Sequence, residues 1–122
     1  MSLKRIILRL ARNPGITSGD PEKGYVIIAP LTPDGDIDLD AWREHRKACT
    51  VVRFDPDPEE RADGWLTHRA SQWHIHYDED HEGPDEPAYR LGDHRFLPGE
   101  YVTIRHHGEE PLTYKVSEVL PS

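Results

Sequence analysis

Two histidines and a carboxylate alternate along one short segment of this chain. Residues 74–78 are His-Ile-His-Tyr-Asp, and His81 follows three residues later. Every second side chain of a β-strand lies on the same face, so His74, His76 and Asp78 are expected to project together. Imidazole and carboxylate groups are zinc ligands, and three of them leave a fourth position open for water or substrate. The spacing therefore predicts a zinc site with hydrolytic chemistry.

The register of the preceding hairpin decides whether His68 joins this site. Residues 65–69 and 73–77 are joined across Ala-Ser-Gln at 70–72, and together they are predicted to form a β-hairpin. A three-residue loop at 70–72 places His68 opposite His74. His68 is then a further candidate ligand.

We favour the three-residue loop because it places Trp65 opposite Tyr77 on the core side, and both Trp65 and Trp73 on the same side as Ile75. A loop of two or four residues would instead move Leu66 and His68 to the apolar face, and the site would lose His68. Both registers remain open at this point.

An outward strand face also explains His74, His76 and Asp78 without any metal. Such a face needs polar side chains, and histidine and aspartate serve as well as any. In that case both histidines are exposed, and replacing them with alanine leaves the fold stable.

The charge of the chain argues against several classes of partner. Asp and Glu total 23 against 15 Lys and Arg, which gives a net charge of −8. That charge repels phosphate backbones, so nucleic-acid binding is not expected. No apolar run approaches the ~20 residues of a membrane span, so no membrane association is expected. The single cysteine, Cys49, cannot form an intramolecular disulfide, which favours the cytoplasm.

One helix is predicted, over residues 39–48. Asp38 is a suitable N-cap, and Trp42, His45 and Cys49 share a helical stripe that would pack on a sheet. Cys49 is therefore expected in the core rather than in nucleophilic chemistry. Arg46 and Lys47 lie off the stripe.

The other elements are predicted strands. The clearest is 112–120, in which apolar and polar residues alternate, and it follows a strand at 101–105 that begins after a Pro-Gly turn. Residues 24–29 and 50–54 are further strands. Residues 3–12 fit either a buried strand or a short basic amphipathic helix lying on a membrane, and we favour the strand.

Taken together, the 122 residues predict a single domain, 1–122, of the mostly-β (α+β) class. About six short strands and one helix near 39–48 favour a small, strongly bent sheet or a partly open β-barrel.

The sequence also resembles a family of short uncharacterised bacterial proteins with no described function. The resemblance is carried by residues 10–15 (Leu-Ala-Arg-Asn-Pro-Gly), by Gly24-Tyr25, by Trp42 with Arg46 and Cys49, by His68-Arg69 and by residues 92–102. It implies a bacterial cytoplasmic protein and implies no activity, substrate or cofactor.

Two functions are consistent with these features. The first is a non-enzymatic binding or accessory protein of the cytoplasm, with a protein partner and no cofactor. The second is a metal-binding protein or metal-dependent hydrolase centred on His74, His76 and Asp78, with zinc as the metal.

Overall fold

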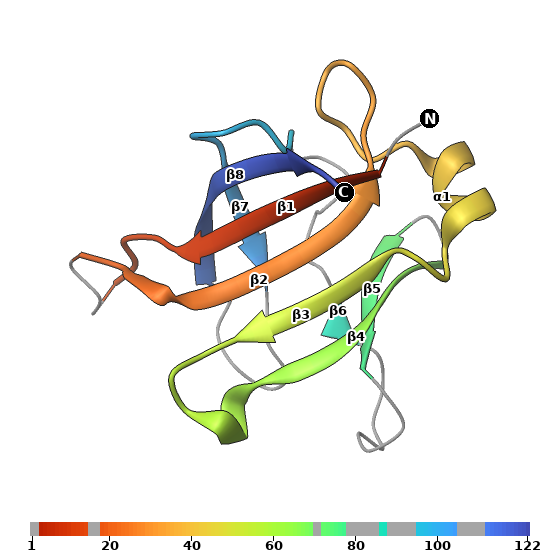
Figure 1. The fold of residues 1–122 in the computed structure, drawn as a ribbon. Helices are drawn as coiled ribbons and strands as arrows, with labels where there is room; N and C mark the ends of the chain where they lie inside the picture. The colour runs from red at the N-terminus through yellow and green to blue at the C-terminus, as the bar shows by residue number, and fades with distance from the viewer. Residues whose placement is uncertain (1–2, 15–17, 70–71, 78–85, 88–94, 105–111) are drawn as a thin grey trace.

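The computed structural model describes residues 3–14, 18–69, 72–77, 86–87, 95–104 and 112–122. These residues form one antiparallel sheet that curls into a half-barrel, with a helix at one end (Figure 1). In sheet order, the strands are β6 (Glu86–Pro87), β5 (Gln72–Tyr77), β4 (Ala62–Arg69), β3 (Thr50–Phe54), β2 (Asp20–Pro30), β1 (Leu3–Leu10), β8 (Leu112–Pro121) and β7 (Tyr101–Ile104).

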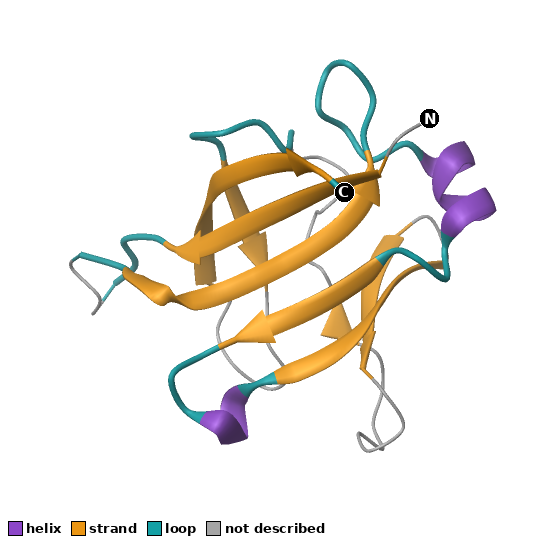
Figure 2. Cartoon of the chain, viewed as in Figure 1, coloured by secondary structure: helices purple, strands orange, loops and turns teal. Residues whose placement is uncertain are grey.

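The predicted fold class is confirmed: strands dominate the described chain, as Figure 2 shows. Among the described residues the sheet has eight strands, compared with the predicted number of about six. Seven of them correspond to the segments named above, and the eighth is the two-residue strand β6 at the sheet edge. Helix α1 (Leu39–His45) ends three residues earlier than predicted, and a 3-10 turn, η1 (Pro58–Glu60), precedes β4. In the described residues, no helix has the length and apolar character needed to span a membrane.

Strand β1 lies in the interior of the sheet, which excludes the helix considered for residues 3–12. It pairs with β2 on one side and with β8 on the other, so its backbone groups are satisfied along both edges. Ile6, Leu8 and Leu10 face the concave side and are buried. The alternation of these apolar residues with the others of the segment therefore indicates a strand that has one face toward the core.

The core fills the concave side of the sheet. Its largest fully buried side chain is Tyr25 on β2, whose ring meets Tyr114 of β8 edge to face, with the centroids 5.2 Å apart. On β8 the alternation is interrupted by a bulge opposite Ile7 and Leu8, and Val119 then packs against the core.

Helix α1 begins as predicted at its N-cap. The Asp38 carboxylate accepts a hydrogen bond of 3.1 Å from the backbone N–H of Ala41. Trp42 is 6% exposed, and its indole Nε1–H donates a 3.0 Å hydrogen bond to the carbonyl oxygen of Leu66 on β4. The helix is thereby fixed against the end of the β4–β5 hairpin. Cys49 is fully buried, as predicted, whereas His45 is exposed because the helix ends there.

Candidate functional site

The β4–β5 hairpin adopts the two-residue loop, so the favoured three-residue register is wrong. Arg69 pairs with Gln72, and His68 therefore lies opposite Trp73 instead of His74. This register buries Leu66 against Ile75 on the core side. In this register Trp42 packs on Trp73, with the ring centroids 5.3 Å apart, and donates a hydrogen bond to the carbonyl oxygen of Leu66.

His68 lies among tryptophans and apart from the other two candidate ligands. Its ring centroid is 4.6 Å from that of Trp73 and 6.1 Å from that of Trp42. It is half-buried and on the opposite face of the hairpin from His74 and His76. The predicted contribution of His68 to a metal site is therefore wrong.

His74 and His76 do share the outward face of β5, as predicted. His76 is exposed, but His74 is half-buried because β6 pairs beside it, with Pro87 opposite His74. The Nδ1 atom of His74 is buried and has no hydrogen-bond partner among the described residues. Asp78 and His81 lie outside the described residues. Within the described part of the chain, no three His, Cys, Asp or Glu side chains are grouped to hold a metal ion.

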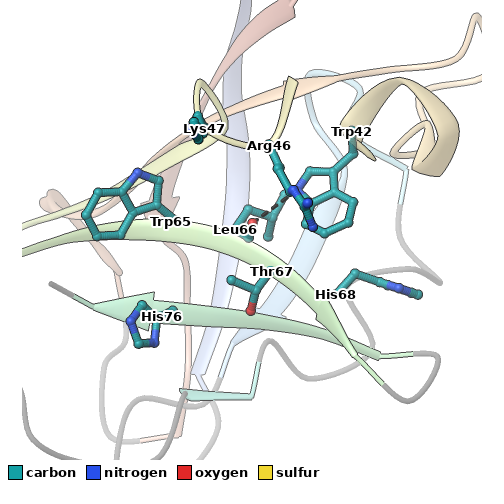
Figure 3. Close-up of a pocket in the computed structure, with 8 residues that line it drawn as sticks. All are labelled: Trp42, Arg46, Lys47, Trp65, Leu66, Thr67, His68 and His76. Atoms are coloured by element: carbon teal, nitrogen blue, oxygen red, sulfur yellow. Dashed lines mark hydrogen bonds between the residues drawn. The ribbon is translucent and has the colours of Figure 1, made fainter. Parts of the chain in front are cut away.

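A groove of about 430 Å³ runs between the end of α1 and strand β4, and this aromatic groove is our candidate site (Figure 3). A volume of this size lies within the range of small-molecule and peptide pockets. Its lining residues are Trp42, Arg46, Lys47, Trp65, Leu66, Thr67, His68 and His76.

Aromatic rings stand at both ends of the aromatic groove. At one end, the Trp65 and His76 rings lie 6.4 Å apart and are tilted by 31°, and at the other Trp42 lies beside His68. Arg46 lines the same groove and is drawn near Trp42 in Figure 3. The groove thus combines flat apolar surfaces with a guanidinium.

Trp65 is the most unusual of these residues because 40% of its surface is exposed. It was predicted to face the core opposite Tyr77, but it points outward and pairs with His76. Exposed tryptophans are uncommon, and they are over-represented among the residues that dominate the binding energy of protein interfaces.

The charge of the aromatic groove is opposite to that of the chain. Arg46 and Lys47 follow the last helical residue and are exposed on one wall. Among the residues that the structure describes, none that lines the groove is acidic, although the chain carries a net charge of −8. The groove therefore suits a group that combines an apolar ring with negative charge.

Nucleophilic chemistry has no support from the one cysteine. Burial raises the pKa of the Cys49 thiol to about 11, so the thiol stays protonated and unreactive at neutral pH.

Sequence reasoning identified Trp42 as a core residue but did not assemble the aromatic groove. The signal that was available is the hairpin loop, because two-residue loops are the commonest in β-hairpins. That register turns Trp65 and His76 outward together. Arg46 and Lys47 were recognised only as residues outside the apolar stripe.

Comparison of the chain with protein-family models, with curated proteins and with solved structures found no match.

Proposed function

We propose that this protein is a binding or accessory protein of the bacterial cytoplasm, and that its aromatic groove holds a short acidic segment of a protein partner. The observation that carries the proposal is the combination of Trp65 with Arg46 and Lys47 in a groove whose described lining residues include no acid. A ring from the partner would stack on Trp65, and carboxylates beside it would meet the two cations.

A protein segment fits these features better than a nucleic acid does. The aromatic groove has two cations, whereas the chain as a whole has a net charge of −8 and repels a continuous phosphate backbone. A few carboxylates next to an aromatic residue require only the local positive charge. Their attraction is screened beyond about 8 Å at physiological salt, so the distant acids of the chain oppose it weakly.

The test is a calorimetric titration at physiological salt with an acetylated and amidated peptide, Asp-Asp-Phe-Asp-Asp. We expect saturable one-to-one binding by the wild-type chain and none for Lys-Lys-Phe-Lys-Lys. Trp65→Ala should remove binding, and Arg46→Glu should weaken it at least about tenfold because it reverses a charge in the groove.

Arg43→Glu provides the matched control. Arg43 is exposed on helix α1, three residues before Arg46, and does not line the aromatic groove. Its Nη1 lies 3.4 Å from Oδ1 of Asp40. Its reversal should change the affinity less than about twofold. Equal losses for Arg43→Glu and Arg46→Glu would contradict the proposal. Preferential binding of an oligothymidine would do so too, and would favour nucleic acid instead.

Metal binding is a second candidate function, favoured by the two histidines on the outward face of β5. The buried Nδ1 of His74 lacks a hydrogen-bond partner among the described residues, and His76 is two residues along the same face. With Asp78 as a third ligand, these residues would form an open zinc site.

A zinc titration of chelator-stripped protein tests this second candidate. One-to-one binding tighter than about 1 μM, lost in His74→Ala and in His76→Ala, is the expected result. His68→Gln should leave the zinc affinity unchanged because His68 lies on the other face of the hairpin. Weak binding, or chemical-shift changes scattered over the surface, would leave the histidines as a polar strand face.

A further inference from the structure

A second pocket lies at the opposite end of the sheet from α1. It has a volume of about 350 Å³. It is formed where β1 and β3 end and where β2 and β8 begin, with the β3–β4 connection and its turn η1 along one side (Figure 1). The open end of a β-barrel is a frequent place for small-molecule sites. We call this the barrel-end pocket.

A buried arginine lines the barrel-end pocket. Arg53 follows the fully buried Val51 by two residues on β3, so its side chain faces the same concave side and is only 8% exposed. Placing a guanidinium in a protein interior costs several kcal/mol of lost hydration unless anions or hydrogen-bond acceptors face it. Arg53 already has interactions within the protein, Glu60 among them, and its place at the pocket wall also lets it face a ligand. A guanidinium can bind a carboxylate through two hydrogen bonds.

The rim of the same pocket carries an acidic side chain beside this arginine. The carboxylate oxygen Oε2 of Glu60 lies 3.8 Å from Nη2 of Arg53, and the Glu60 side chain is 45% exposed. Glu60 is therefore nearer to solvent than Arg53. A ligand that entered with its carboxylate first would bring a neighbouring cationic group to Glu60.

Two other carboxylates of the pocket are engaged within the β3–β4 connection. Asp55 accepts a 2.9 Å hydrogen bond from the backbone N–H of Asp57, and Asp57 accepts a 3.0 Å hydrogen bond from that of Glu59. These bonds hold the connection in place and so fix the position of Glu60. Glu60 is thus the acid at the pocket best placed to meet a ligand.

The remaining surface of the barrel-end pocket is partly apolar. Leu10, Leu112 and Tyr114 line it beside the charged groups. An apolar side chain on the ligand would cover these residues and exclude water from the Arg53 guanidinium. Exclusion of water strengthens the charge–charge contact.

We propose that the barrel-end pocket binds a free α-amino acid with an apolar side chain. The α-carboxylate lies on Arg53, the α-ammonium group lies on Glu60, and the side chain lies against Leu10, Leu112 and Tyr114. The two charged groups of an amino acid are attached to one carbon, which matches the adjacent placement of Arg53 and Glu60. A pure anion is disfavoured by the acidic rim, and a pure cation is disfavoured by Arg53.

The experiment is a titration of the full ¹⁵N-labelled chain with L-leucine and L-phenylalanine, followed in amide and arginine Nε–H spectra. We expect saturable shifts at Gly24, which lines the pocket, at Arg53 and at Leu112. N-acetyl-L-leucine lacks the ammonium group and L-leucinamide lacks the carboxylate. Each should bind at least about tenfold more weakly, because each loses a charge-assisted hydrogen bond.

Glu60→Gln separates recognition of the ammonium group from effects on folding, because the side chain is at the surface. It should weaken leucine binding about tenfold and leave N-acetyl-L-leucine unchanged. Asp63→Asn, an exposed acid outside the pocket, is the control for charge and should have no effect. Arg53→Gln should abolish binding in a chain that circular dichroism shows to be folded.

Three results would overturn the proposal. They are the absence of saturable shifts with both amino acids up to about 20 mM, equal binding of leucine and N-acetyl-L-leucine, and unchanged leucine binding by Glu60→Gln. If Arg53→Gln does not fold, leucine binding by Glu60→Gln still tests the proposal.

Discussion

Replacement of Trp42 by alanine removes the side chain that joins helix α1 to the β4–β5 hairpin. The indole is 6% exposed, meets Trp73 edge to face with the centroids 5.3 Å apart, and donates a hydrogen bond to the Leu66 carbonyl oxygen. Trp42→Ala therefore removes apolar burial, an aromatic contact and a buried hydrogen bond in one step.

The magnitude follows from the buried area. A tryptophan buries ~150–250 Å². At ~25 cal/mol per Å², this gives an upper limit of ~4–6 kcal/mol. The Leu66 carbonyl loses its donor, but the enlarged groove admits water that can take its place. We expect Trp42→Ala to lower the free energy of unfolding by about 3–5 kcal/mol.

The assay is urea unfolding followed by far-UV circular dichroism, which does not depend on tryptophan emission. Trp65→Ala is the control: it removes the same side chain from the other end of the aromatic groove, but from a position that is 40% exposed. We expect a smaller cost than for Trp42→Ala, about 1–3 kcal/mol, because less of this side chain is buried. Trp42→Phe should fall between the two, because it keeps most of the packing and leaves the Leu66 carbonyl without its donor.

A loss below about 1 kcal/mol for Trp42→Ala, or equal losses for Trp42→Ala and Trp65→Ala, would refute this reasoning. Either result would mean that the helix does not dock through Trp42. The wall of the aromatic groove would then need another explanation.

Three further predictions concern other parts of the sheet. His76→Ala should change the free energy of unfolding by less than about 0.5 kcal/mol, because the side chain is exposed; a larger loss in a urea melt would place it in the core. Gly24→Ala should lower the free energy of unfolding by about 1–3 kcal/mol, because a Cβ at this position would overlap the carbonyl oxygen of Leu8. An unchanged midpoint temperature in a thermal melt of Gly24→Ala would contradict the close approach of β1 and β2. The Cys49 thiol, with its pKa raised by burial to about 11, should react with a thiol reagent far more slowly in the native chain than in urea. Because the folded state holds this proton more tightly, Cys49 favours folding below the pKa of the unfolded thiol, and that contribution is lost as the pH rises through about 11. Rapid labelling of the native chain at neutral pH would show that the core opens there.

Features set by neighbouring residues were predicted well from the sequence. The Asp38 N-cap and the Pro-Gly turn before β7, where φ of Gly99 is 93°, depend on side chains and backbone preferences within a few residues. The mostly-β class follows from the alternation of apolar residues, since a sheet that buries one face selects every second side chain. Even the ambiguous N-terminal segment was assigned correctly to a strand.

The hairpin register illustrates what the local pattern left open. In both registers Trp73 and Ile75 lie on the core face. A three-residue loop adds Trp65 to that face, whereas a two-residue loop adds Leu66. The choice between them depends on Trp42, which comes from a helix more than 20 residues earlier and donates its hydrogen bond to Leu66. That choice removed His68 from the predicted metal site.

The residues that line each of the two pockets are far apart in the sequence. The aromatic groove brings Arg46 of the segment after α1 beside Trp65 of β4. The barrel-end pocket brings Arg53 near Leu112, almost 60 positions later. The sequence by itself determined the strands, the helix and the polarity of the chain, because these depend on local preferences and on alternation. Only the curling of the sheet decided which charged and aromatic side chains meet, because curvature brings together strand ends that no local pattern relates.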